Sequence, residues 1–130
     1  MAAYFSVGNM DQIFPSAAER QALAERLGLP YSDLMQDWEY EVADPQRFAD
    51  FLEEYESPMA SEGERVSLME ILIQCTEDAQ SDSLWSKLTP HLQAHPELHR
   101  HTIQYWCCYG LDHPDEMFWV SARMRTLLLG

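Results

Sequence analysis

The apolar residues of this chain recur at helical spacing. Phe48, Phe51, Leu52 and Tyr55 occur at i, i+3, i+4 and i+7, which places all four on one face of a helix. The stretch 62–80 differs, because its apolar residues occupy most of the helix circumference. Such a pattern is typical of a helix that others surround. The sequence therefore predicts an all-α fold with 62–80 as its central apolar helix.

Capping signals mark where several of these helices begin. Ser16 with Glu19, and Ser61 with Glu64, each form the capping-box pattern, in which the serine hydroxyl and the glutamate carboxylate bind amides at a helix start. Gly28 can adopt the left-handed conformation that ends a helix. Helices are therefore expected to start at both serines, and the first to end before Gly28.

Prolines give further boundaries. Helix starts are predicted at Asp44-Pro45, Pro96-Glu97 and His113-Pro114, because a proline in the first turn loses an amide that has no partner there. Pro90 lies inside a helical pattern at about 82–94, and we expect it to kink or divide that helix. The prolines thus predict three helices in the last third of the chain.

The segment after Pro30 is ambiguous. Leu34, Trp38 and Val42 follow at i, i+4 and i+8, which favours a helix that opens near Pro30. The alternation of residues 38–42 also permits a short strand. We favour the helix, which brings the prediction to a compact bundle of about six helices.

Length and composition fit one globular domain over residues 1–130. The chain has 130 residues, of which 46% are hydrophobic, enough for one core. No apolar run has the length of a membrane span, and the first residues lack the pattern of a secretory signal. Three cysteines, two of them adjacent, suit reduced thiols better than disulfides. We therefore expect a cytoplasmic protein that does not bind membranes.

Negative charge is concentrated in the middle of the chain. Residues 31–82 contain fifteen Asp/Glu against Arg47 and Arg65, whereas residues 1–30 sum to −1 and residues 83–130 to zero. An anionic field repels nucleic acid and anionic membranes, and it attracts basic protein surfaces. The charge pattern thus predicts a basic protein partner and argues against nucleic-acid binding.

The candidate partner-binding residues come from this acidic stretch. They are Asp33, Asp37, Trp38, Tyr40, Glu41, Asp50, Glu53 and Glu54. Asp33, Asp37 and Glu41 recur every four residues, so on one helix they would stack like charges at a cost in stability. A docking face for a basic partner would explain that cost, with Trp38, Tyr40 or Tyr55 as aromatic anchors. The alternative is a solvated face that only keeps the protein soluble.

The C-terminal third offers residue types that zinc accepts. They are His91, His95, His99, Cys107 and Cys108. However, Pro96 interrupts the four-residue spacing of the histidines, and both cysteines lie near the C-terminal end of a helix, where the dipole disfavours a thiolate. Glycine-rich phosphate loops are absent from the sequence. We therefore predict no catalytic residue, no metal site and no cofactor.

The functional hypothesis is a small acidic, non-enzymatic protein-binding module. Its acidic face would dock a basic partner, as an immunity-type inhibitor of a cationic toxin or nuclease does. One alternative is a small helical enzyme or metal-binding protein that uses the His/Cys-containing C-terminal third. Another is a DNA-mimic inhibitor, and the aromatic content also permits a homo-oligomer.

Overall fold

The computed structural model describes residues 12–110 and 117–129, and within these ranges it contains helices and no strands. The α-helices are α2 (Ala17–Leu27), α3 (Trp38–Val42), α4 (Phe48–Glu56), α5 (Glu62–Ala79), α6 (Asp82–Ala94), α7 (Arg100–Cys107) and α8 (Trp119–Leu129), and a 3₁₀ turn, η1 (Pro45–Arg47), precedes α4. Six of the α-helices have eight residues or more. The prediction of a compact all-α bundle of about six helices is therefore confirmed.

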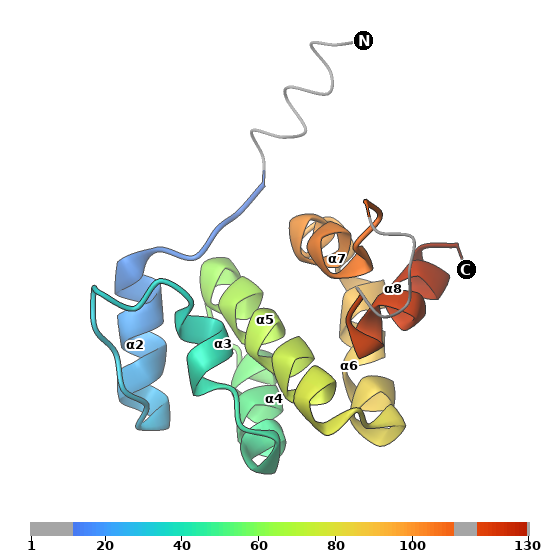
Figure 1. Cartoon of the computed structure of the whole chain (residues 1–130). Coiled ribbons are helices and arrows are strands. Elements are labelled where there is room, and N and C mark those ends of the chain that lie inside the picture. The colour runs from blue at the N-terminus through green and yellow to red at the C-terminus, as the bar shows by residue number, and fades with distance from the viewer. Residues whose placement is uncertain (1–11, 111–116, 130) are drawn as a thin grey trace, which may run out of the picture.

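Helix α5 is the centre of the fold. It contacts each of the other α-helices and η1. Its buried residues lie around the whole circumference, and Leu68, Met69, Ile71 and Leu72 are fully inaccessible to solvent. Figure 1 shows α2, α3 and α4 on one side of α5 and α6, α7 and α8 on the other. The prediction of a central apolar helix near 62–80 is confirmed.

Both predicted capping boxes are present. The Ser16 hydroxyl accepts a hydrogen bond from the Glu19 amide, and the Glu19 carboxylate accepts one from the Ser16 amide. Ser61 and Glu64 make the same reciprocal pair at the start of α5. Gly28 ends α2 at a φ of 68°, in the left-handed region. Local sequence thus determines both ends of α2 and the start of α5.

The segment after Pro30 was predicted to be helical, and this is wrong for its first part. The helix begins only at Trp38, and Leu34 is 90% exposed. The Ser32 hydroxyl accepts a hydrogen bond from the Leu34 amide, and the Ser32 carbonyl accepts one from the Met35 amide. These local bonds form a turn that competes with a helix. Residues 38–42 are helical, which resolves the helix-or-strand ambiguity.

Two proline predictions are altered by the structure. Asp44 caps as expected, accepting from the Gln46 amide, but the first turn is the 3₁₀ turn η1 and α4 begins at Phe48. Pro90 does not divide its helix, because α6 continues through it. Leu88 and Leu92 on either side are buried in the core. Their packing stabilises both halves of the helix and outweighs the helix-breaking tendency of Pro90.

Helix α7 begins later than predicted. Residues 96–99 form turns, and α7 starts at Arg100. The predicted start at His113-Pro114 lies outside the described residues. Within α8, Val120 and Met124 are buried and Leu127 packs against the core. In the described ranges, no helix combines the length and the apolar character needed to cross a membrane.

Candidate partner-binding surface

Five of the eight predicted partner-binding residues separate into two groups. Asp37 and Tyr40 line a pocket of about 200 Å³ formed by the 12–15 segment, the 36–37 connection and helices α2, α3, α5 and α7. Asp50, Glu53 and Glu54 line a different groove, between α2 and α4. Asp33 and Glu41 are exposed and line neither of these two cavities. The structure therefore does not join the eight residues in one continuous site.

Trp38, predicted as a partner anchor, is buried and offers almost no surface to a partner. Only 1% of its surface is exposed, and its indole N–H donates to the Pro30 carbonyl at 2.7 Å. Tyr55 is also buried, with 2% exposed. Both rings belong to the core, because removing a large aromatic ring from water is strongly favourable. Tyr40 alone of the three proposed anchors is partly accessible.

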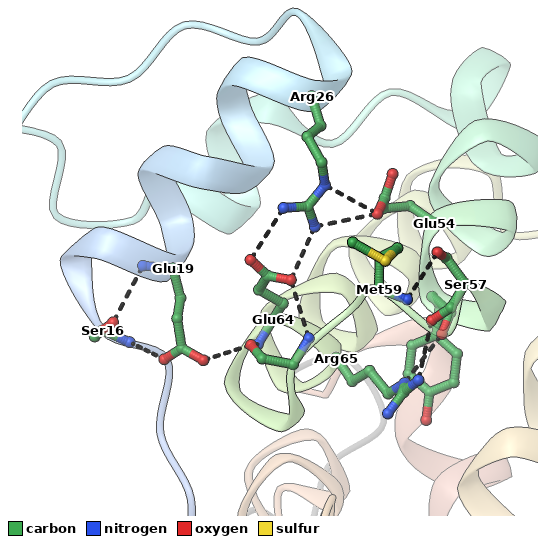
Figure 2. A network of polar contacts seen from close by, with 10 residues as sticks. Ser16, Glu19, Arg26, Glu54, Ser57, Met59, Glu64 and Arg65 are labelled. Carbon is green, nitrogen blue, oxygen red and sulfur yellow. Dashed lines mark hydrogen bonds and ion pairs between the residues drawn. The ribbon is translucent and has the colours of Figure 1, made fainter.

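Several carboxylates of the acidic stretch hold the fold together. Figure 2 shows Arg26 of α2 between Glu54 of α4 and Glu64 of α5. The guanidinium lies 3.1 Å from Glu54 and 2.8 Å from Glu64. Burial opposes ionisation of Glu64, but the hydrogen bonds from Arg26 outweigh it and hold the pKa of Glu64 below its usual value. Glu54 is thus occupied by an internal arginine.

Glu19 joins the two capping boxes. Its carboxylate accepts from the Ser16 amide at 2.9 Å and from the Ser61 hydroxyl at 2.6 Å (Figure 2). The bond from Ser61 is the main cause that lowers the pKa of Glu19. The carboxylate also lies directly over Gly63, where an added Cβ would come within 2.2 Å of it. Glycine at this position allows α2 and α5 to share one carboxylate.

Two further carboxylates are used between helices. Glu39 is 8% exposed and accepts from Arg20 at 2.6 Å and from the Ser67 hydroxyl at 2.7 Å. Glu77 accepts from the amides of Trp119 and Val120, at the N-terminus of α8. A carboxylate at that end satisfies amides that the helix leaves free. Part of the predicted acidic face is therefore internal structure.

The carboxylates left for a partner lie mainly in the 33–41 segment. Asp33, Asp37 and Glu41 are exposed, and their side chains make no ion pair or hydrogen bond to any other residue in the described part of the chain. Because α3 starts at Trp38, the three do not stack on one helix as the spacing predicted. On α4, Glu53 is similarly unpaired among described residues, whereas Asp50 pairs with Arg47 at 3.1 Å.

Glu39 and Glu70 both line the pocket beside α3. Glu70 accepts from the Tyr40 hydroxyl at 2.8 Å and from the Trp106 indole N–H at 3.2 Å. Burial is the largest cause that raises the pKa of Tyr40, and the negative charge of Glu70 raises it further. The Tyr40 hydroxyl therefore stays protonated and remains a donor to Glu70 at neutral pH.

Aromatic rings lie in and beside the same pocket, and the sequence alone does not identify them. Phe14 is 57% exposed and packs on His101, with ring centroids 5.1 Å apart. Tyr105, 49% exposed, lies parallel to Tyr40 at 6.4 Å and near Phe118 at 6.2 Å. His101 and Tyr105 are four residues apart on α7, a spacing that could have indicated one shared face.

Two of the candidate histidines of the C-terminal third have structural partners. His91 lies 2.9 Å from Glu56, and buried His99 lies 2.6 Å from the Tyr55 hydroxyl. Within the described ranges, no three His, Cys, Asp or Glu side chains are grouped closely enough to hold a metal ion. Cys107 is buried, and that burial raises its pKa. The thiol is therefore protonated and a poor nucleophile at neutral pH.

Similarity to known proteins gives no further information on this surface. No family model, curated protein or solved structure matches the chain. The function must therefore be argued from the geometry and the charge of the surface itself.

Proposed function

We propose that this chain is a non-enzymatic protein-binding module that docks a basic protein on its α3 side. It would act by occlusion, in which its carboxylates pair with the Lys and Arg side chains of the partner that would otherwise bind phosphate. An immunity-type inhibitor of a cationic toxin or nuclease acts in this way, and this is the class to which we assign the chain. We place this activity in the cytoplasm, which suits three cysteines that are free thiols.

The observation that carries the proposal is the separation of charge across α5. Residues 17–79, which include α2 to α5, contain sixteen Asp/Glu and four Arg, whereas the described residues 80–110 and 117–129 contain two Asp/Glu and four Lys/Arg. Helices α2, α3 and α4 lie together on one side of α5 (Figure 1). The anionic field is therefore directional, and a directional field orients a basic partner before contact.

The α3 side is favoured over the groove between α2 and α4. In the groove, Asp50 and Glu54 pair with Arg47 and Arg26. Only Glu53 of the groove carboxylates is unpaired among the described residues, whereas three exposed and unpaired carboxylates, together with accessible aromatic rings, are found around α3. Aromatic side chains contribute most of the binding energy in many interfaces, and unpaired charges have no internal bond to lose.

The test is affinity capture with charge-matched variants. The first variant, Asp33→Asn, Asp37→Asn and Glu41→Gln, removes three charges from the 33–41 segment. The control variant, Asp78→Asn, Asp82→Asn and Glu97→Gln, removes three charges from exposed positions outside α2 to α4. Both proteins should keep the wild-type circular dichroism spectrum, because none of the six side chains is buried.

The wild type and the control variant should retain the same basic proteins at about 0.05 M salt and release them as the salt rises to about 0.5 M. The 33–41 variant should lose them. Equal retention by all three proteins, or retention of acidic proteins alone, would show that the 33–41 carboxylates do not select the partner.

A further inference from the structure

The pocket beside α3 has an imbalance of charge. Asp37, Glu39 and Glu70 line it, and Arg20 is the one Lys or Arg among its lining residues. Arg20 is bonded to Glu39. Glu70 has only neutral donors among the described residues, namely the Tyr40 hydroxyl and the Trp106 indole. The half-buried carboxylate of Glu70 is therefore oriented by hydrogen bonds without being neutralised by a cation.

The hydrogen bonds on Glu70 leave one of its oxygens available. Both neutral donors bind Oε2. Oε1 has no hydrogen-bond partner among the described residues. The one buried side-chain polar atom without a partner in this part of the chain is His99 Nδ1, so Oε1 of Glu70 is not buried. This oxygen therefore retains access to solvent. A carboxylate that is held rigidly on one oxygen and open on the other can accept a bond from an incoming donor.

The walls of the pocket suit a flat cation. Tyr40 contributes its ring, which lies 5.9 Å from Trp106 and 6.4 Å from Tyr105. Phe14 and His101 form another aromatic wall. Aromatic faces attract cations, and a guanidinium stacks on them more readily than an ammonium because it is planar and more weakly hydrated. The volume of about 200 Å³ is that of one long side chain and not of a larger ligand.

We propose that this pocket receives one arginine side chain of the basic partner, with Glu70 as the carboxylate that binds the guanidinium. This inference rests on the proposed function and specifies its anchor point. Tyr40 is then a positioning residue, because its hydroxyl holds Glu70 while its ring faces the arginine. The exposed carboxylates of the 33–41 segment guide the partner, and the pocket fixes its orientation.

The test uses the full chain and a short probe, acetyl-Gly-Arg-Gly-amide, followed by ¹H–¹⁵N NMR. Tyr40, Val66 and Thr102 line the pocket. Their backbone amide signals should shift as peptide is added, and the shifts should saturate at millimolar peptide concentrations. The same peptide with uncharged citrulline in place of arginine should cause no saturable shift. Glu70→Gln keeps the side-chain size and should weaken binding about tenfold, as expected when a charge-assisted hydrogen bond is lost.

Glu53→Gln removes the same charge from the groove between α2 and α4, and it should leave the peptide affinity unchanged. Equal weakening by the two variants, or equal binding of the citrulline peptide, would overturn the inference. The arginine peptide should also displace the captured partner. If it binds the pocket without displacing the partner, the pocket takes free arginine compounds and is not the anchor.

Failure of the pocket and failure of the proposed function give different results. If Glu70→Gln retains the partner while the 33–41 variant loses it, the pocket inference is wrong and the proposed docking surface stands. If the 33–41 variant also retains the partner, the proposed function itself fails.

Discussion

At the residue scale, single buried polar groups determine how the fold responds to pH. His99 is completely buried, and its Nδ1 has no hydrogen-bond partner within the described residues. Its Nε2 lies 2.6 Å from the Tyr55 hydroxyl. Burial, together with the nearby His95 and His91, lowers the pKa of His99 to about 4. The folded state therefore holds His99 neutral.

The neutral state of His99 makes stability fall with acidity. The folded pKa of His99 lies below the unfolded value of 6.5. Its contribution to the free energy of unfolding is therefore complete above pH 6.5 and decreases as the pH falls toward 4. The loss should reach about 3 kcal/mol in the free energy of unfolding, measured by urea denaturation across this range. His99→Gln should be less stable at pH 7.5 but should show a flatter pH dependence than wild type.

His101→Gln is the matched control for this prediction, because His101 is exposed and is not among the groups that lower the pKa of His99. It should keep the wild-type pH dependence. Identical slopes for wild type and His99→Gln would mean that another group causes the acid sensitivity.

Gly63 gives a second prediction at this scale. Gly63→Ala pushes the Glu19 carboxylate away and breaks its bond with Ser61, so it should lower the free energy of unfolding by about 1 kcal/mol. In a Glu19→Ala background the same change should be neutral or stabilising by up to about 1 kcal/mol, because alanine is the better helix former. Chemical denaturation of the four proteins of this double-mutant cycle measures the difference. Additive effects would show that Glu19 does not restrict position 63.

At the scale of elements, ion pairs join the helices on the acidic side of α5. Arg26 is the central residue, since it connects α2 to α4 through Glu54 and to α5 through Glu64. Glu64 has only 7% of its side chain exposed. A nearly buried carboxylate without its cation is costly, because the protein interior solvates charge poorly.

Arg26→Leu should therefore lower the free energy of unfolding by about 2 kcal/mol, a figure reduced for the partial exposure of Arg26. Arg47→Leu is the matched control, because Arg47 pairs with exposed Asp50 on the surface. It should cost less than about 1 kcal/mol, as surface pairs do. Thermal or urea denaturation distinguishes the two, and equal losses would show that Arg26 contributes no more than a surface pair.

The elements that the sequence predicts correctly are those with local signals. Both capping boxes and the central apolar helix follow from patterns within a few residues, and these are the features that the structure confirms. At Leu34 a local turn competes with the predicted helix, whereas at Pro90 the outcome depends on packing against other parts of the chain. Leu34 lies in a turn formed by Ser32, and α6 continues through Pro90 because Leu88 and Leu92 are held in the core.

The candidate site was predictable only in part, for a related reason. The sign of the charge and the abundance of carboxylates in the 33–41 segment can be read from the sequence. The pocket cannot, because Glu39 and Tyr40 of α3 line it together with Glu70 of α5, and Phe14 reaches His101 from the other end of the chain. Sequence spacing also cannot distinguish exposed carboxylates from those that Arg20 and Arg26 occupy.

At the scale of the whole molecule, the separation of charge across α5 is the feature that the functional account depends on. Internal arginines neutralise part of the acidic half, but residues 17–79 still carry twelve more acidic than basic side chains.

Net repulsion of this size opposes the compact state. Added salt should therefore stabilise the isolated protein, with a melting temperature that rises between about 0.02 and 0.3 M NaCl. A melting temperature that falls over this range would show that attraction within the chain exceeds the repulsion.

The most direct measurement is the association rate of the captured basic partner as a function of salt, for wild type and for the Asp33→Asn, Asp37→Asn, Glu41→Gln variant. The account predicts a wild-type rate that falls steeply with ionic strength, and a variant rate that is slower and has a shallower dependence. Two rates that coincide at every salt concentration would contradict it.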